Sequence, residues 1–255
     1  MVEAQSSVSL YNEAGLVNIQ DYIKLYNEGM QLDKIKPLKN QTYRLFKESG
    51  LDIRIVHRSK TYANARAFNK IKYFLKANDY FYMIPVTTLK GTIVGFIVRG
   101  VLKSDYNTVS RTFSSYESQV PLMYGFDKKF STYDKVVEKK GKCLPIIVCE
   151  GSKDCIMLKK FYPYVVANNT SSMGINAQVL RTITNKFLLA YDNDQAGFDG
   201  IKKDKKILRG LGAYVESLQL HKGFKDCADY LDYPNKFNEL KKQIKTKLKK
   251  LYEIG

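Results

Sequence analysis

Acidic side chains follow two apolar runs of the chain, at the point where each run ends. Glu150 closes the run LPIIVCE, and Asp192-Asn193-Asp194 closes the run FLLAYDND. If both runs are neighbouring parallel strands, as their composition indicates, their carboxyl ends place three carboxylates at one sheet edge, where open α/β folds bind ligands. Such a cluster repels itself unless it holds a divalent cation, and Mg²⁺ prefers oxygen ligands together with water and substrate phosphates. These residues therefore predict metal-dependent phosphoryl or nucleotidyl chemistry.

The segment that carries these carboxylates alternates between short apolar runs and helical patterns, which is typical of a parallel sheet covered by helices. We expect strands in LPIIVCE, YVVAN, FLLAYDND and AYVESLQL, and helices near residues 152–161, 175–184 and 196–210. The following stretch HKGFKDCADYL reads as a loop that adds Asp226 and Asp229. The predicted fold class is α/β, with a central parallel sheet flanked by helices, preceded by a basic mixed α+β subdomain.

The flanking regions complete a predicted division into four parts: residues 1–65, 66–142, 143–235 and 236–255. The first contains helical stretches near residues 19–29 and 41–50, and the second contains an apolar hairpin in residues 80–102 around a Lys-Gly turn. The last is a basic amphipathic helix with an apolar face of Phe237, Leu240, Ile244, Leu248 and Leu251. Two interpretations of that helix stay open. It docks on the body with its lysines in solvent, or it binds nucleic acid, a helicase or an acidic membrane surface.

The positive charge of the chain is unevenly distributed. The net charge is +17, and residues 1–142 hold 23 basic and 13 acidic side chains, whereas residues 143–235 hold 12 and 10. The last 20 residues carry 7 basic and 2 acidic side chains. Basic regions on both sides of a nearly neutral acidic centre indicate a polyanionic substrate, because phosphate neutralisation by Lys and Arg supplies most nucleic-acid affinity.

Several classes of protein are excluded by composition. No apolar run approaches the roughly 20 residues that cross a bilayer, and the first residues lack the pattern of a signal peptide. The four cysteines form no C-x-x-C pair, and only two histidines are available, which argues against a structural zinc site and a disulfide scaffold. We therefore expect a globular, cytoplasmic protein with no membrane span and no zinc.

Three motifs taken together resemble the TOPRIM domain of bacterial-type primases, topoisomerases and several small nucleases. They are EGSKD (150–154), DNDQAG (192–197) and KDCADYL (225–231). The resemblance implies that Glu150, Asp192 and Asp194 are catalytic residues that hold divalent metal, and that Asp226 is the next acidic ligand. Primases often have Asp-Pro-Asp at the last motif, where this chain has Asp226-Cys227-Ala228-Asp229. The role of Asp229 stays open.

The segment ahead of these motifs resembles DnaG-type primases in particular. Their RNA polymerase domain contains a strand pair with a pattern that Pro85, Gly91, Gly95, Phe96 and Arg99 follow here. The stretch PLMYGFDK (121–128) is similar to the Leu-Tyr-Gly element of the same family. The resemblance covers about residues 65 to 232 and extends to no zinc-binding module.

This resemblance implies the catalytic core of a DNA primase without its zinc-binding domain. Such an enzyme is a DNA-directed RNA polymerase that makes short RNA primers on single-stranded DNA from NTPs by two-metal nucleotidyl transfer, with Mg²⁺ or Mn²⁺ as cofactor. A replicative helicase or a separate zinc-binding subunit is an implied partner. The abundance of Lys, Asn and Tyr is compatible with an AT-rich phage genome, and hence with phage DNA replication in a host cytoplasm.

Basic side chains near the predicted centre are candidates for nucleic-acid and nucleotide binding. We expect the template path to be lined by Arg99, Arg111, Lys128 and Lys129. Lys153 either contacts phosphate or is a solvated residue of the first helical turn. Base stacking is considered for Tyr80, Tyr82, Tyr106 and Tyr124, although most of these side chains fit core or strand-surface positions better.

Two other functions compete with the primase. A TOPRIM nuclease would use the same carboxylates to cut nucleic acid, and a non-catalytic relative would bind nucleic acid or support assembly. The intact set of Glu150, Asp192 and Asp194 weighs against the non-catalytic alternative. The upstream hairpin favours synthesis over cleavage.

Overall fold

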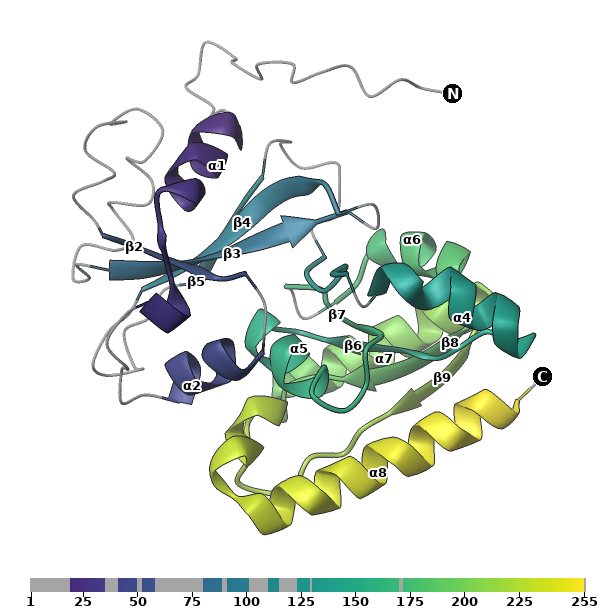
Figure 1. Cartoon of the computed structure of the whole chain (residues 1–255). Helices are drawn as coiled ribbons and strands as arrows, with labels where there is room; N and C mark the ends of the chain where they lie inside the picture. The colour runs from purple at the N-terminus through teal and green to yellow at the C-terminus, as the bar shows by residue number, and fades with distance from the viewer. Residues whose placement is uncertain are drawn as a thin grey trace, which may run out of the picture. The chain divides into compact units, whose positions relative to one another are not determined.

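The computed structural model describes residues 19–34, 41–49, 52–57, 80–88, 91–100, 110–114, 123–128, 130–169 and 172–254. These residues form two compact units. The first holds the N-terminal helix and an antiparallel sheet; the second holds helix α2 (Gln41–Glu48) and every element from residue 123 onward. Figure 1 labels the elements of both units. The division into residues 1–65, 66–142, 143–235 and 236–255 stays a prediction.

The first unit is a five-stranded sheet in the order β1-β2-β3-β4-β5. Its elements are α1 (Ile19–Asn27), β1 (Met30–Gln31), the 3-10 helix η1 (Leu32–Lys34), β2 (Arg54–His57), β3 (Tyr80–Thr87), β4 (Ile93–Gly100) and β5 (Ser110–Ser114). Helix α1 packs on this sheet, because Tyr22, Leu25 and Tyr26 share a buried cluster with Phe81 and Phe96. The mixed α+β subdomain expected from the sequence is confirmed.

Strands β3 and β4 form the hairpin expected around the Lys-Gly turn. Gly91 has φ +83°, and its amide donates to the carbonyl of Thr88 across 2.9 Å. A positive φ is the conformation that glycine adopts without the penalty of a Cβ atom. The glycine at this position therefore fixes where the two apolar strands reverse direction.

The second unit contains a four-stranded sheet in the order β7-β6-β8-β9, and all its pairs are parallel. Its strands are β6 (Ile146–Cys149), β7 (Val165–Ala167), β8 (Lys186–Ala190) and β9 (Tyr214–Ser217). Every residue of β6, β7 and β8 is buried, as is typical of parallel strands that are covered on both faces. The α/β class and the parallel sheet predicted from the apolar runs are confirmed.

Helices cover both faces of this sheet. They are α4 (Tyr133–Lys140), α5 (Ser152–Leu158), α6 (Asn176–Ile183), α7 (Gln195–Gly210) and α8 (Pro234–Glu253), with 3-10 helices η4 (Phe130–Thr132) and η5 (Cys227–Asp232). Leu180 of α6 and Leu208 of α7 share one buried cluster with Val148 and Leu189, which project from the same sheet face. Helix α5 contacts β7, β6 and η5, while η5 and the strands β8 and β9 contact α8, drawn in yellow (Figure 1).

The strand order creates a switch point between β6 and β8. Strand β6 connects through α5 to β7 on one side, and β8 connects through α7 to β9 on the other. Because such crossovers are right-handed, α5 and α7 cover opposite faces, and the loops after β6 and β8 part from each other. Open α/β sheets bind their ligands in the crevice formed there.

The described part of the PLMYG stretch, residues 123–125, extends this sheet beyond β7. The amide and carbonyl of Tyr124 both bond Ala167, at 3.0 and 2.7 Å, in an isolated antiparallel bridge. Gly125 follows with φ +121°, and a Cβ atom there would lie 2.4 Å from the carbonyl oxygen of Val165. The glycine is required for both reasons, so this motif has a clear structural role.

The remaining differences from the predicted elements are local. Strand β9 ends at Ser217 rather than continuing to Leu220, and part of the expected HKGFKDCADYL loop forms η5. Leu240, Ile244 and Leu251 of α8 are buried, so the predicted apolar face of that helix packs on the unit. In the described ranges, no helix combines the length and apolar character that a membrane span needs.

Candidate functional site

The predicted carboxylates meet at the carboxyl ends of β6 and β8. These strands are direct neighbours with Cys149 opposite Ala190, so the residues that follow them leave the sheet side by side. The amide of Asp192 donates a hydrogen bond to Oε1 of Glu150 across 3.1 Å. The contact expected between the two sequence motifs is therefore present.

Asp194 lies at the start of α7, where its side chain caps the helix. Its Oδ1 accepts from the amide of Gly197 across 3.0 Å. A Cβ atom at residue 197 would lie 2.0 Å from the carbonyl oxygen of Asp192 and 3.0 Å from Oε1 of Glu150. The glycine after the D-x-D pair thus lets the helix start directly against the carboxylates.

Asp226 closes the group from the loop after β9. Asp226 and Asp229 form a capping box, in which Oδ1 of Asp226 accepts from the Asp229 amide at 2.9 Å and Asp229 accepts from the amides of Lys225 and Asp226. Asn193, shortly after β8, holds this loop, because its backbone amide donates to the Lys225 carbonyl at 2.6 Å. The structure gives Asp229 a role in shaping the loop.

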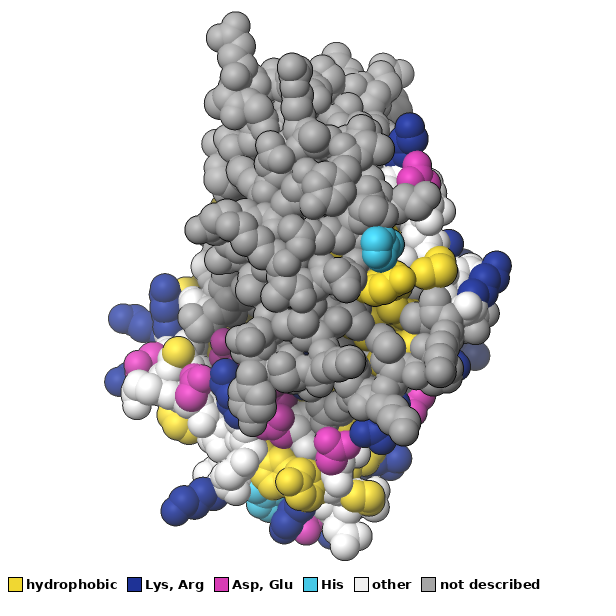
Figure 2. Space-filling model, turned by 90° about the vertical axis from the view of Figure 1, so that its left-hand side faces the viewer, with side chains coloured by type: hydrophobic (Ala, Val, Ile, Leu, Met, Phe, Trp, Pro, Cys, Tyr) yellow, Lys and Arg dark blue, Asp and Glu magenta, His cyan; other side chains and the backbone are white. Residues whose placement is uncertain are grey.

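The electrostatics of the group show mutual repulsion. Burial raises the pKa of Asp192 to about 7, with further contributions from the charges of Glu150, Asp226 and Asp194. Burial also raises the pKa of Glu150 and of Asp226. Carboxylates that lie this close together resist ionisation. A bound cation stabilises their ionised form. Figure 2 shows Asp and Glu side chains dispersed among Lys, Arg and apolar side chains on the lower part of one face.

Asp154 belongs to the same group, although the sequence analysis gave it no role. It is 5% exposed, and its Oδ1 accepts from the amide of Ala228 across 3.0 Å. Burial, followed by the charges of Asp226 and Asp192, raises the pKa of Asp154 well above its usual range. Its place four residues after Glu150, one helical turn away, was the available signal. We interpret it as a positioning residue for the Asp226 loop.

Two lysines bring positive charge to these carboxylates. Nζ of Lys225 lies 3.7 Å from Oδ2 of Asp192. The charge of Lys153 lowers the pKa of Asp226 and of Asp154, against the larger effect of burial. Lys153 is half-buried on the first turn of α5, so it is not a fully solvated residue.

Carboxylate oxygens are the ligands that suit a divalent cation. In this structure, however, the carboxylates are turned toward backbone amides. In the part of the chain that the structure describes, no group of three or more His, Cys, Asp or Glu side chains is arranged to hold a metal ion. Glu150, Asp194 and Asp226 each accept a backbone amide hydrogen bond. Each carboxylate retains further lone pairs for a metal.

The other basic residues predicted to contact nucleic acid lie in different environments. Arg99 lies half-buried in β4 of the first unit, and Arg111 lies in β5, where only its backbone is described. Lys128 is exposed in the second unit, and Lys129 lies outside the described residues. Their contacts with a template stay predictions.

The tyrosines considered for base stacking mostly occupy core positions. Tyr82 is 1% and Tyr124 is 5% exposed, so neither ring is available to a base. Tyr80 is exposed, and Tyr106 lies outside the described residues. The expectation that core positions prevail is correct for Tyr82 and Tyr124.

Comparison with known proteins first defines the class of the second unit. Residues 147–231, which include all five carboxylates Glu150, Asp154, Asp192, Asp194 and Asp226, match the Toprim-like family. Curated protein sequences give no match to the chain. The domain that holds the candidate site is therefore a Toprim-like domain.

Solved structures then define the fold of the whole chain. A DnaG catalytic core matches with TM-score 0.61 and 17% identity, over 88% of this chain and 79% of that chain. A DnaG primase catalytic domain bound to single-stranded DNA matches with TM-score 0.60 and 17% identity, over 91% and 81%. The E. coli primase catalytic core matches with TM-score 0.58 and 16% identity, over 89% and 78%. The chain therefore shares the fold of DnaG catalytic cores, as the sequence motifs suggested.

Proposed function

We propose that this chain is the catalytic core of a DNA primase, which joins ribonucleotides into short RNA primers on single-stranded DNA. The observation that carries the proposal is the convergence of Glu150, Asp192, Asp194 and Asp226 at the switch point of the Toprim-like sheet. That cluster lies within a fold shared with DnaG catalytic cores, one of which was solved with single-stranded DNA.

The residues that would hold Mg²⁺ or Mn²⁺ are these four carboxylates. A divalent ion bound there would lower the pKa of an attacking 3′-hydroxyl and neutralise charge on the triphosphate and the pyrophosphate leaving group. Binding requires Asp192 to lose its proton, which it does only near pH 7 in the absence of a cation. A bound cation would therefore favour the ionised form of these carboxylates.

The neighbouring side chains supply orientation and charge. Lys225 and Lys153 bring positive charge to the carboxylates and are the candidates for contact with the phosphates of an NTP. The Asp226 loop is held from two sides, by the Asp154 carboxylate and by the Asn193 side chain, which donates to the carbonyls of His221 and Phe224 at 3.2 and 3.0 Å. This bracing keeps the loop next to the ends of β6 and β8, where the substrate phosphates would lie.

A primer-synthesis assay tests the proposal. The protein is incubated with a single-stranded DNA template, all four NTPs including a labelled one, and Mg²⁺ or Mn²⁺. Labelled oligoribonucleotides are expected, and Asp192→Ala should abolish them. Asp199→Asn is the matched control, because Asp199 is an exposed carboxylate of α7 outside the cluster.

A second label, on the template, separates the primase from a TOPRIM nuclease. Shortening of the template without RNA synthesis, lost in Asp192→Ala, would favour the nuclease. If neither product forms, even after addition of a replicative helicase and a zinc-binding subunit, catalysis is rejected and the non-catalytic role is favoured.

A further inference from the structure

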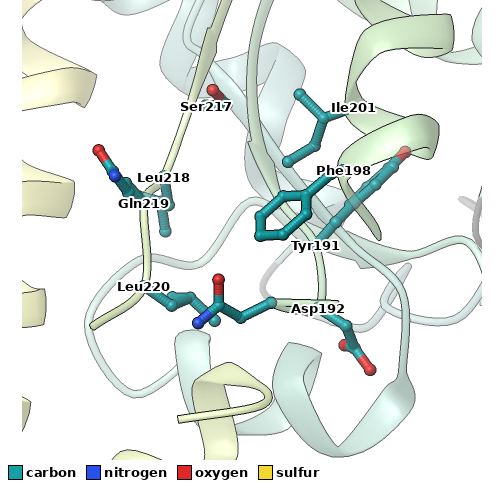
Figure 3. A pocket seen from close by; sticks show the side chains of 9 residues that line it. Tyr191, Asp192, Phe198, Ile201, Ser217, Leu218, Gln219 and Leu220 are labelled. Atoms are coloured by element: carbon teal, nitrogen blue, oxygen red, sulfur yellow. The ribbon is translucent and has the colours of Figure 1, made fainter. Parts of the chain in front are cut away.

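A pocket with an exposed aromatic ring adjoins the candidate site on the β9 side. It has a volume of about 280 Å³, and its lining includes Asp192, Phe198, Ile201, Ser217, Leu218 and Leu220. Figure 3 shows the Phe198 ring and Ile201 pointing toward Leu218 and Leu220, while the Asp192 carboxylate turns away from the pocket. Phe198 is 51% exposed, although it lies only four residues after Asp194. One wall of this apolar hollow is therefore a residue of the acidic cluster.

Positive side chains gather at the other end of the pocket. Ser217 lines the pocket, and its Oγ accepts from Nζ of Lys205 across 2.8 Å. Next to it, Glu216 pairs with Lys247 at 2.8 Å and with Lys250 at 2.5 Å. Burial, then the charge of Arg209, lowers the pKa of Lys205, and Lys247 adds to this effect. Helix α7 thus brings Lys205 to Ser217, and helix α8 brings Lys247 and Lys250 to Glu216, the neighbouring residue of β9.

The order of these features along the surface is acidic cluster, apolar pocket, then cations. Lys205 donates to Ser217, which itself lines the pocket, so the pocket and this cation are adjacent. The pocket suits a base, because a base has an apolar face. The cations suit the phosphate next to that base. A single strand that reached the cations through the pocket would have its end next to Asp192.

We propose that this surface, made of Phe198, Leu218, Lys205 and Lys247, binds single-stranded nucleic acid, with one base stacked on Phe198 and the adjacent phosphate at the two lysines. The occupant is a strand rather than a free nucleotide, because the cations lie beyond the pocket from the site proposed for the triphosphate. A strand is favoured over an acidic protein because the apolar pocket accepts a planar ring. This inference deepens the proposed function, since such a strand would be template or product.

Equilibrium binding in EDTA tests the surface without any catalysis. A labelled oligo-dT strand and an abasic strand of equal length are titrated with the protein, and anisotropy is followed at several salt concentrations. Phe198→Ala should weaken binding of oligo-dT about 5- to 100-fold and leave the abasic strand unaffected, because stacking needs a base. Tyr214→Ala is the matched control, since Tyr214 is a 46% exposed aromatic at the other end of β9.

Charge variants test the phosphate contact. Lys205→Gln with Lys247→Gln should lower the slope of log affinity against log salt by about 1.4 for both strands. Lys242→Gln with Lys245→Gln removes equal charge from exposed positions on the opposite face of α8 and should leave the slope unchanged. Thermal melting checks that each variant is folded.

Two results would overturn the inference. One is oligo-dT binding within twofold of the unsubstituted protein for Phe198→Ala, and the other is an equal loss of slope in both lysine pairs. Displacement of oligo-dT by polyglutamate at equal charge concentration would indicate an acidic-protein surface and would also reject it. Primer synthesis is measured in a separate assay. If the strand binds at this surface but no RNA forms, the proposed function is rejected while the binding surface stands.

Discussion

The Asp192 amide donates to Oε1 of Glu150, so the backbone at the end of β8 holds the carboxylate at the end of β6. The two residues are 42 positions apart in the chain, and the parallel pairing of their strands brings them together. The hydrogen bond and the negative charge of Glu150 are separate properties. A substitution that keeps the first and removes the second distinguishes structural from chemical contributions.

Glu150→Gln is that substitution. Its amide oxygen can still accept from the Asp192 amide, so the thermal midpoint without metal should change by only a few degrees. Primer synthesis should fall at least about 100-fold if the charge holds a catalytic cation. Stabilisation by Mg²⁺, measured as the shift in midpoint with added metal, should shrink as well. An active Glu150→Gln enzyme would contradict the assigned role.

The raised pKa of Asp192 predicts a pH dependence of stability in metal-free protein. Because the pKa rises from 3.8 in the unfolded chain to about 7, the folded state binds the extra proton between these values. The contribution of the protonated Asp192 side chain to the free energy of unfolding is therefore full below about pH 4, and it is lost as pH rises through 7. Asp192→Asn should remove this dependence and be more stable than the unsubstituted protein at pH 8, by about 1 to 2 kcal/mol after solvent screening.

Urea denaturation in EDTA at pH 5, 6, 7 and 8 measures this difference. Added Mg²⁺ should reverse the ranking at pH 8, because only the protein with Asp192 gains a ligand for the cation. Parallel pH curves for the two proteins would show that Asp192 titrates normally.

Gly197→Ala tests the close approach of α7 to the carboxylates. The new Cβ atom would lie 2.0 Å from the Asp192 carbonyl oxygen, so the D-x-D backbone must shift. We expect a loss of about 1 to 3 kcal/mol in the free energy of unfolding, together with loss of primer synthesis. Gly210→Ala at the end of the same helix is the control. Apart from the backbone of its own helix and its chain neighbours, no heavy atom lies within 4 Å of its Cβ position, and alanine there should stabilise by about 0.5 to 1 kcal/mol. Similar effects of the two substitutions would reject the packing argument.

Asp154 separates loop positioning from metal binding. Asp154→Ala removes one acceptor of the buried Ala228 amide, at an expected cost of about 1 kcal/mol in the free energy of unfolding. Asp154→Asn keeps an acceptor oxygen and removes a charge that burial disfavours, so stability and activity should be largely retained. Denaturation midpoints and primer-synthesis rates measure both variants. An inactive but stable Asp154→Asn protein would instead indicate that its charge contributes to the reaction.

The sequence predicted the sheet well where burial is complete. Strands β6, β7 and β8 are short apolar runs followed by polar residues, and the pattern located them to within a few residues. Strand β9 was predicted too long, because Leu218 and Leu220 are apolar as in a strand but line a pocket after the strand has ended. Hydrophobicity alone does not distinguish these two environments.

The polar interior was harder to predict. Asp204 lies among lysines in α7, yet it is fully buried and accepts from Ser172, from the Met173 amide and from the Tyr191 hydroxyl. Asp154 is similar, since its acceptor role depends on Ala228, 74 residues away. Both roles depend on long-range contacts that local spacing does not encode. The carboxylates of the motifs were identifiable because their positions follow directly from strand ends.

The bridge between Tyr124 and Ala167 has a consequence for the behaviour of the protein in solution. Strand β7 ends the parallel sheet, and a terminal strand with free amides and carbonyls is a template for strand addition by another molecule. The Tyr124 backbone occupies Ala167 on that side, and Gly125 allows the approach. A substitution that detaches this stretch would therefore expose the edge of β7 to strand addition and promote self-association.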